Sequence, residues 1–455
     1  MKTLLVTISE PTAVRNILRG RLWEIFAGAS DLRIVLVLPP HMEAIYGAEF
    51  AGTNIVVESL SPAKFSWQER IISYLTRNTL HSPTVQMNQW REYYERKELG
   101  KLLCKRVFWW LGPVVWFLPS SLRHWDLSLT PTQEIRHLFD TYQPAAVFST
   151  ITQDEGINLP ILREARRRGV YSFGMMRGWD NFSNYGYVRI VPDHFFLQNE
   201  YLYESAKKFQ KFPQHTTFSV VGFPQMDWYF RKELIIPRET FLKGLGIDPS
   251  KRVILYGALG DYLFPREGDI SELFETLVDQ GKLPGDLVMI FRAHPQFTSP
   301  LDRMESMRHV VPDRNALYRG AGLTEWDMGE REFQHLMNSI YHSEFVITSA
   351  STMALDAVAL GKPAISVAFE KTSMPYWLSG RRFRCHFEHY QELMKTGGVF
   401  RADTPEALLG GIEQYLRNPY ANEEGRKELS RRFLLPLDGH SSEQIANTIL
   451  RKLSV

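Results

Sequence analysis

Three loops in the second half of the sequence combine glycine, cationic and hydroxyl side chains, and each directly follows a short apolar run. We call them the glycine loop (257–260), the His-Pro loop (292–295) and the serine loop (349–352). Glycine lets a ligand approach the backbone, arginine and histidine donate hydrogen bonds to an anion, and small hydroxyl side chains leave room for it. If the loops meet, they predict a phosphate or diphosphate site. Its candidate residues are Gly257, Gly260, Arg292, His294, Ser349, Ser351 and Thr352.

The segment 345–369 indicates how the serine loop is built. A strand is predicted to end near Ile347, and Ser349 or Ser351 is placed to cap the helix that follows. That helix runs through Ala359 and stops at a Gly-Lys-Pro turn before the next strand. A helix that begins where a parallel strand ends presents free backbone N–H groups to an anion. The same pattern also fits a capped βαβ unit that binds nothing.

Strand-like and helix-like patterns alternate along the chain in two successive blocks. Such alternation is typical of parallel sheets, so we predict an α/β protein with two Rossmann-like, doubly wound domains that face each other across a cleft. A charged, proline-containing linker separates the blocks. We therefore place one domain at 1–236, a second at 237–437, and a final helix at 438–455 that packs back across the interface. Ligands of such sheets bind at the carboxyl ends of strands, so the three loops are expected at one edge of the second sheet.

A basic, tryptophan-rich insertion at about 64–125 departs from this alternation. From Lys64 to Arg123, ten Lys and Arg residues stand against four Glu, a balance of +6, whereas the whole chain carries +2. Tryptophan beside cationic residues is typical of segments that lie in an anionic membrane interface, which predicts a peripheral contact through 101–123. The alternative is a buried core helix that is interrupted by a Gly-Pro pair. The tryptophans concerned are Trp109, Trp110 and Trp116.

The overall composition excludes several classes of protein. A net charge of +2 gives no global signal for nucleic-acid binding. The two cysteines lie far apart and form no metal pattern, which fits a reducing cytoplasm. No apolar run approaches the roughly 18 residues of a membrane span. We expect a cytoplasmic protein, with a peripheral contact at the inner face of the cytoplasmic membrane.

The His-Pro and serine loops carry a specific resemblance. Arg-x-His-Pro, followed some fifty residues later by Ser-x-Ser-Thr-Met-x-x-Asp-Ala-x-x-x-Gly-Lys-Pro, resembles the donor half of GT-B glycosyltransferases, above all the CDP-glycerol glycerophosphotransferase-like and surface-carbohydrate biosynthesis families. Bacterial sialyltransferases carry a His-Pro motif and a serine motif in the same order. The resemblance covers about 145–369. It implies metal independence and a nucleotide-activated donor, with no separate cofactor. It implies phosphate contacts for His294, Ser349, Ser351 and Thr352, and charge neutralisation by Arg292. Asp356, inside the helix after the serine loop, is placed to reach the donor's sugar or ribose.

A second signature, Gly-Trp-Asp-Asn-Phe-Ser-Asn-Tyr-Gly at 178–186, follows a strand of the first block, and we call it the Trp-Asp-Asn loop. It resembles a segment of the surface-carbohydrate family, whereas glycerophosphotransferases show Trp-His-Gly in the corresponding place. The resemblance implies that Asp180 is the catalytic base and that Trp179 and Asn181 contact the acceptor. Asp154, in an acidic-acidic-glycine motif like that of bacterial sialyltransferases, is the rival base. Either aspartate could instead cap a helix or organise a turn.

These patterns together predict a metal-independent GT-B glycosyltransferase. It moves a sugar from a nucleotide-activated donor, held by the second domain, to a hydroxyl of a lipid-linked surface glycan such as lipopolysaccharide or capsule, held by the first. Three alternatives share the architecture: a CDP-polyol phosphotransferase, a nucleotide-sugar 2-epimerase, and a non-catalytic binder of glycans or nucleotides.

Overall fold

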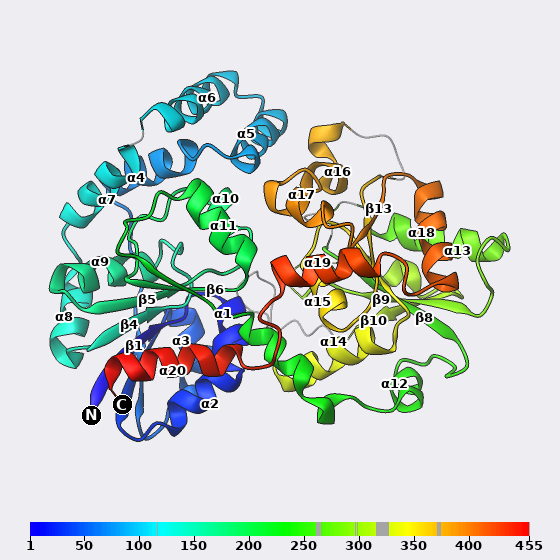
Figure 1. Cartoon of the computed structure of the whole chain (residues 1–455), viewed down its shortest axis with the longest axis horizontal. Helices are drawn as coiled ribbons and strands as arrows, with labels where there is room; N and C mark the ends of the chain where they lie inside the picture. Colours follow the sequence, from blue (N-terminus) through cyan, green and yellow to red (C-terminus); the bar gives the residue numbers. More distant parts are fainter. Residues whose placement is uncertain are drawn as a thin grey trace. The chain divides into compact units, whose positions relative to one another are not determined.

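The computed structural model describes residues 1–454 except 116, 261–263, 265, 296, 298, 315–326 and 371–374. The chain forms two compact units (Figure 1). The first unit contains 1–227 together with 435–455, and the second contains 228–434.

The first unit is built on a seven-stranded parallel sheet with the strand order β3-β2-β1-β4-β5-β6-β7. The order reverses between β1 and β4, so the loops after these two strands diverge and leave a ligand position between them. Leu4 and Val6 enter one core and Leu5 enters the core on the opposite face, as expected for a parallel strand covered on both sides. The strands are β1 (Lys2–Thr7), β2 (Leu32–Leu38), β3 (Ile55–Ser59), β4 (Ala146–Ser149), β5 (Tyr171–Met175), β6 (His194–Leu197) and β7 (Thr217–Val220).

Helices cover both faces of this sheet (Figure 1). The last helix, α20 (Ser441–Leu453), returns to the first unit and buries Ile445, Ile449 and Leu453 in the same core as β1. Asp227 fixes its start, because its carboxylate accepts hydrogen bonds from the backbone N–H groups of Ser441 and Ser442 at 3.1 and 2.8 Å. The other helical segments are α1 (Pro11–Ala13), a π-helical turn (Val14–Leu18), α2 (Arg21–Gly28), α3 (Pro40–Phe50), α8 (Gln133–Tyr142), α9 (Asn158–Arg168), α10 (Asn181–Asn184), α11 (Glu200–Phe209) and a 3-10 turn (Pro224–Phe230) at the unit boundary.

The insertion forms four helices between β3 and β4, at the upper left of Figure 1. They are α4 (Trp67–Asn78), α5 (Pro83–Arg96), α6 (Leu99–Val114) and α7 (Leu118–Ser128). A buried ion pair joins them to the sheet, because Arg163 of α9 contacts Asp126 of α7 at 2.6 Å and Glu69 of α4 at 3.0 Å. Gly112 allows α6 to cross α4, since a Cβ atom there would lie 2.0 Å from the carbonyl oxygen of Thr79.

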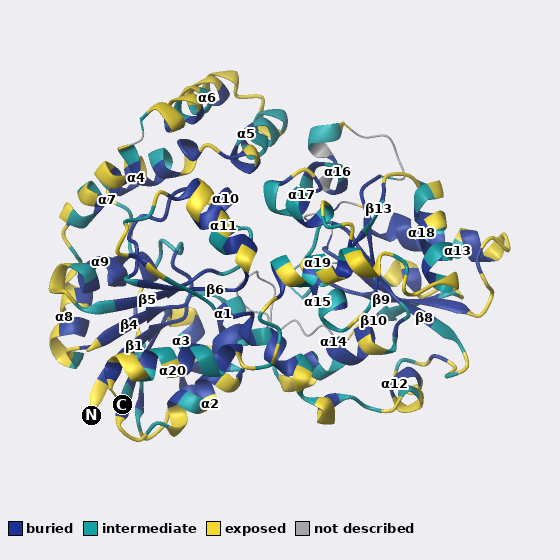
Figure 2. Cartoon of the chain, in the orientation of Figure 1, coloured by how far each residue is buried: buried dark blue, intermediate teal, exposed yellow. Residues whose placement is uncertain are grey.

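The outer helix α6 carries an exposed apolar stripe, visible as exposed ribbon in Figure 2. Trp110 is 64% exposed, whereas its neighbour Trp109 is 8% exposed and donates a hydrogen bond from Nε1 to the carbonyl oxygen of Ser82. Trp109 is therefore a core residue, as the alternative interpretation of this segment predicts. Trp116 lies outside the described residues. The exposed apolar residues of the stripe are Leu99, Leu103, Val107, Trp110, Leu111, Val114 and, just beyond the helix, Phe117.

The second unit contains a six-stranded parallel sheet with the order β10-β9-β8-β11-β12-β13, which reverses between β8 and β11. Its strands are β8 (Arg252–Gly257), β9 (Leu287–Arg292), β10 (Val310–Asp313), β11 (Val346–Thr348), β12 (Ala364–Val367) and β13 (Phe400–Ala402). Its α-helices are α12 (Arg238–Gly244), α13 (Gly268–Asp279), α14 (Glu330–His342), α15 (Met353–Ala359), α16 (Gly380–Arg384), α17 (Glu388–Met394), α18 (Pro405–Arg417) and α19 (Glu423–Phe433). Short 3-10 turns lie at Lys232–Leu234, Leu301–Met304 and Tyr376–Leu378.

No helix among the described residues is long and apolar enough to cross a bilayer.

Candidate functional site

The glycine, His-Pro and serine loops follow three adjacent strands of the second sheet. Gly257 pairs in register with Arg292, and the N–H of Ala258 donates to the carbonyl oxygen of Arg292 at 3.0 Å. The hydroxyl of Thr348 donates to the carbonyl oxygen of Gly257 at 3.0 Å. The three loops therefore begin side by side at the carboxyl edge, where the strand order reverses between β8 and β11.

The glycine loop is shaped by a buried carboxylate that the sequence did not reveal. Glu267 accepts hydrogen bonds from the backbone N–H groups of Leu259 at 2.7 Å and Gly260 at 2.6 Å, and from the hydroxyl of Tyr256 at 3.3 Å. Gly260 has a φ of +80°, a conformation that favours glycine. Burial raises the pKa of Glu267 to about 7, although these hydrogen bonds act in the opposite direction.

A fully buried arginine lies close to this carboxylate. Arg381 contacts Glu370 at 2.5 Å, and its charge also acts on Glu267 and Tyr256. Glu370 further accepts a hydrogen bond from the hydroxyl of Ser379 at 3.0 Å. Glu370 is thus held by protein groups.

The serine loop contains a buried hydroxyl with no hydrogen-bond partner among the described residues. Ser349 is 1% exposed, and its Oγ has no partner, while its carbonyl oxygen accepts from the hydroxyl of Tyr390 at 3.2 Å. Ser351 Oγ accepts from the N–H of Met353, the first residue of α15, at 3.2 Å. Ser351, and not Ser349, therefore caps the helix. Thr352 is the N-cap residue but makes no side-chain capping bond.

Asp356 lies one turn into α15 and accepts a hydrogen bond from the hydroxyl of Tyr229 at 2.9 Å. Gly257 also faces α15, because a Cβ atom at this position would lie 2.9 Å from Cγ of Met353. The first turn of α15 thus lies next to the end of β8.

Arg292 and His294, the two functional candidates of the His-Pro loop, differ in their exposure and in their partners. Arg292 is 5% exposed, and its Nη1 lies 3.0 Å from the fully buried carboxylate of Asp313. That carboxylate is also 2.9 Å from Nε2 of His335. Arg292 is thus already compensated by a protein carboxylate, whereas the partly exposed His294 stacks on Phe297 with ring centroids 4.9 Å apart. Of the two, His294 is better placed to reach a ligand.

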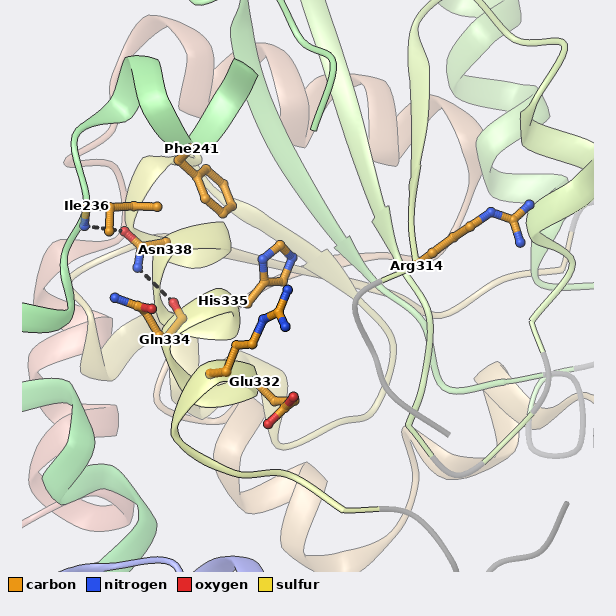
Figure 3. A pocket seen from close by; sticks show the side chains of 8 residues that line it. Ile236, Phe241, Arg314, Glu332, Gln334, His335 and Asn338 are labelled. Atoms are coloured by element: carbon orange, nitrogen blue, oxygen red, sulfur yellow. Dashed lines mark hydrogen bonds between the residues drawn. The ribbon is translucent and has the colours of Figure 1, made fainter. Parts of the chain in front are cut away.

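A cavity with a volume of about 230 Å³ lies beside His335, whose Nε2 contacts Asp313. Figure 3 shows the side chains that line it. Asn338 organises one wall, since it accepts from the N–H of Ile236 at 3.0 Å and donates to the carbonyl oxygen of Gln334 at 2.8 Å. The cavity is lined by Ile236, Phe241, Arg314, Arg331, Glu332, Gln334, His335 and Asn338, so none of the three loops contributes to it.

In the first unit, the two candidate bases have different surroundings. The carboxylate of Asp154 accepts hydrogen bonds from the N–H groups of Gly156, Ile157 and Asn158 at 3.1–3.4 Å and from the Asn158 amide at 2.9 Å. It therefore supports the start of α9. Among the described residues, the carboxylate of Asp180 accepts one hydrogen bond, from Asn184 at 3.3 Å, and so keeps more capacity for a substrate proton.

The neighbours of Asp180 are turned inward. Trp179 and Asn181 are each 3% exposed, and Asn181 Oδ1 accepts a hydrogen bond from the N–H of Gly178 at 3.0 Å. Both residues thus support the Trp-Asp-Asn loop from within, and their predicted contact with an acceptor stays a prediction.

A charged group missed by sequence reasoning lies at the reversal point of the first sheet. Arg177, two residues after the end of β5, contacts both carboxylate oxygens of Glu10 at 3.1 and 3.2 Å and donates to the hydroxyl of Tyr185 at 2.5 Å. Asp180 acts on Arg177 electrostatically. Glu10 follows β1, so its position after a strand was the signal that could have identified it. Among the described residues, no group of three His, Cys, Asp or Glu could hold a metal ion.

The comparison with protein families gives a match over more than half of the chain. The family described as CDP-glycerol:poly(glycerophosphate) glycerophosphotransferase matches residues 188–451. The chain belongs to this family. In this member of the glycerophosphotransferase family, the matched range contains the whole second unit and starts after the Trp-Asp-Asn loop. No curated protein sequence matches the chain significantly.

Solved structures relate this glycerophosphotransferase family member to GT-B proteins. UDP-GlcNAc 2-epimerase from Neisseria meningitidis, bound to UDP-GlcNAc, has a TM-score of 0.56 at 12% identity and covers 99% of this chain and 100% of its own. A putative UDP-N-acetylglucosamine 2-epimerase from Listeria monocytogenes gives 0.55 at 12%, covering 100% and 97%. A glycosyltransferase from Rickettsia africae gives 0.50 at 10%, covering 99% and 98%. At these identities the likeness concerns the fold, and the fold is GT-B, as predicted.

Proposed function

We propose that this protein is a metal-independent glycosyltransferase that moves a sugar from a nucleotide-activated donor to a hydroxyl of a lipid-linked surface glycan. The observation that carries the proposal is the convergence of three loops at the reversal point of the second sheet. There the hydroxyl of Ser349, which has no partner among the described residues, lies after β11, and His294 follows β9, on the other side of β8. The donor diphosphate would occupy this edge, with hydroxyl and imidazole groups as hydrogen-bond donors.

Asp180 is the proposed general base. Transfer of a sugar to a hydroxyl requires one group to take the hydroxyl proton as the new bond forms. Asp180 accepts one hydrogen bond and lies beside Arg177, whereas Asp154 accepts four from the start of α9. This contrast favours Asp180 for the proton transfer and leaves Asp154 a supporting role.

The second candidate is transfer of a polyol phosphate from a CDP-linked donor, which family membership favours. The two reactions would use the same donor edge but break different bonds: the glycosidic C–O bond of the donor, or the bond between phosphorus and the leaving nucleotide. Mass analysis of the product separates them, because only the second adds phosphorus to the acceptor. An epimerase would convert its nucleotide sugar without any acceptor.

Nucleotide binding tests the donor site directly. Thermal unfolding is measured with CMP, CDP, UDP, GDP and dTDP, and we expect one of them to stabilise the protein. Ser349→Ala should leave the ligand-free protein at least as stable, because it removes a buried hydroxyl without a partner, yet it should reduce the shift produced by the nucleotide. His294→Ala should abolish the shift. Ser442→Ala is the control, since Ser442 is an equally buried serine of the first unit. A protein that no nucleotide stabilises would refute the donor site.

We also propose that α6 holds the protein at the inner face of the cytoplasmic membrane. Leu103, Val107 and Trp110 follow one another at helical spacing and are each more than half exposed. Flotation with anionic vesicles should weaken when Leu103 and Trp110 are changed to Ser, with unfolding temperature unchanged. Tyr420→Ser, an exposed aromatic residue of the second unit, is the control. Equal flotation of all three proteins would remove the membrane contact from the proposal.

A further inference from the structure

The cavity beside His335 is lined by none of the three loops of the donor edge. Its walls come from the segment before α12, from α12, from α14 and from the end of β10. Its volume of about 230 Å³ far exceeds the ~10–15 Å³ that a single water molecule needs, so a small ligand fits. Ile236 and Phe241 are its apolar lining, and most of its polar lining belongs to α14 (Figure 3).

His335 is oriented by a buried carboxylate. Its Nε2 lies 2.9 Å from both oxygens of Asp313, which is fully buried and also lies 3.0 Å from Nη1 of Arg292. Because an ionised carboxylate only accepts hydrogen bonds, the ring proton of a neutral His335 is on Nε2, and Nδ1 is an acceptor. Nδ1 has no hydrogen-bond partner among the described residues and is not among their buried, unpartnered atoms. It is therefore the ring nitrogen left for a ligand in the cavity.

Arg331 adds a cationic group on the same face of α14. It precedes His335 by four residues, a spacing that brings two Cβ atoms to within about 5–6 Å of each other. Arg331 is exposed, lines the cavity, and forms no ion pair or hydrogen bond with any residue that the structure describes. Its neighbour Glu332 accepts a hydrogen bond from the N–H of Gly329 at 2.8 Å, and Arg314 pairs at 3.1 Å with a carboxylate that does not line the cavity.

These two side chains select the chemistry of a ligand. The guanidinium of Arg331 donates hydrogen bonds and attracts negative charge, whereas Nδ1 of a neutral His335 needs a hydrogen-bond donor. Phosphate at about pH 8 meets both needs, because it is a dianion that keeps one hydroxyl proton. Sulfate is also a dianion, but it has no proton to donate. A metal ion does not fit, since the guanidinium would repel it and no group of three His, Cys, Asp or Glu among the described residues could hold it.

A ligand in this cavity also acts on the donor edge through Asp313. A hydrogen bond donated to Nδ1 polarises the imidazole and strengthens the bond from its Nε2–H to Asp313, because hydrogen bonds in a chain reinforce one another. Asp313 then neutralises Arg292 of the His-Pro loop less fully, so more of this positive charge is available to a donor diphosphate. The coupling is reciprocal, so a bound nucleotide would in turn tighten phosphate binding.

We propose that this cavity is a second anion site, which binds inorganic phosphate and thereby strengthens nucleotide binding at the donor edge. The phosphate site stands on His335 and Arg331, whereas its coupling to a nucleotide rests on the proposed function. The protein would then bind its donor more tightly where phosphate is abundant.

Isothermal titration calorimetry of the full chain, at pH 8 and constant ionic strength, tests the phosphate site. Phosphate should bind at least about fivefold more tightly than sulfate, because only phosphate donates to Nδ1. Arg331→Gln and His335→Gln should each weaken phosphate binding at least about fivefold; the second variant keeps an N–H group for Asp313 but removes Nδ1. Arg417→Gln is the control, because Arg417 is also an exposed helical arginine of the second unit and does not line the cavity.

Ser349→Ala separates this site from the donor edge, where phosphate would also find hydrogen-bond donors. This variant should keep the phosphate affinity that Arg331→Gln loses. Equal binding of phosphate and sulfate would overturn the site. Phosphate binding that Ser349→Ala weakens and Arg331→Gln does not would overturn it as well, because the phosphate would then belong to the donor edge.

The coupling is measured as the affinity for the nucleotide that stabilises the protein most, with and without saturating phosphate. Phosphate should raise this affinity at least about fivefold in the unmodified protein. It should not raise it in Arg331→Gln, where phosphate can only compete at the donor edge. An equal effect of phosphate in both proteins would overturn the coupling. Phosphate binding that depends on Arg331 in a protein that no nucleotide stabilises would refute the donor site and the coupling, but would confirm the anion site.

Discussion

Replacement of Gly186 by alanine should separate the Trp-Asp-Asn loop from the insertion. Gly186 has a φ of +93°, which costs an L-residue about 1–2 kcal/mol. The new Cβ would also lie 2.8–3.0 Å from three backbone atoms of Thr76 and Arg77, which cannot swing aside as side-chain ends can. Overpacking of this kind costs about 1–3 kcal/mol. The expected total is about 2–5 kcal/mol.

Gly169 provides the matched control for this substitution. Its φ is +67°, and nothing lies within 4 Å of a Cβ atom placed there. Gly169→Ala should therefore show the backbone cost alone, about 1–2 kcal/mol. The difference between the two variants is the cost of the contact with α4.

Urea unfolding of the full chain measures the loss of stability, and amide hydrogen exchange locates it. In Gly186→Ala, exchange should accelerate in α4, whereas in Gly169→Ala the protection of α4 should stay as in the unmodified protein. If the two variants lose equal stability, or if α4 keeps its protection in Gly186→Ala, the reasoning about this contact is refuted.

Other predictions follow from the described contacts. Asp180→Asn should lower turnover at least about 100-fold without changing nucleotide binding. Asp154→Ala should mainly cost about 1–3 kcal/mol of stability, because it leaves backbone N–H groups at the start of α9 unpaired. If Asp154→Ala lost turnover and Asp180→Asn lost stability instead, the roles of the two aspartates would be exchanged. Because burial raises the pKa of Glu267 from 4.5 to about 7, the folded chain keeps a proton that the unfolded chain loses in this window, so stability should fall as pH rises through it. Between pH 5 and 8, the free energy of unfolding of the unmodified protein should fall by at most about 3 kcal/mol relative to that of Glu267→Gln. A difference in unfolding free energy between the two proteins that stays constant over this pH range would contradict the prediction. Asp227→Ala should cost about 1 kcal/mol and accelerate amide exchange at the start of α20, and unchanged exchange there would show that packing alone holds the helix.

The sequence predicted those features that depend on local pattern. Apolar runs such as Leu4-Leu5-Val6 must be covered on both faces, which indicates parallel sheets with helices on either side. Parallel strands end at a common edge, so the adjacency of the glycine, His-Pro and serine loops also followed from the order of strands and helices alone.

What the sequence could not supply depends on distant partners and on helix orientation. Glu267 and Arg381 are far apart in the chain, and only the fold brings their charges together. Trp109 and Trp110 are neighbours in sequence, yet one is buried and the other exposed, because successive residues of a helix point about 100° apart. The composition of the insertion predicted an aromatic segment. Which face of α6 is buried is decided by the contact of α6 with α4.

The return of α20 to the first unit has a consequence for how the chain folds. Strands β1 to β7 are synthesised before the second unit, but Ile445, Ile449 and Leu453, which belong to the same core as β1, are synthesised after it. The first unit therefore stays incomplete throughout synthesis of the second, with an apolar face that must be kept from aggregation until α20 is available. In topological terms, the second unit is inserted into the first near its C-terminus. Truncation of the chain after residue 434 should thus destabilise the first unit, although it removes only a short C-terminal part of that unit.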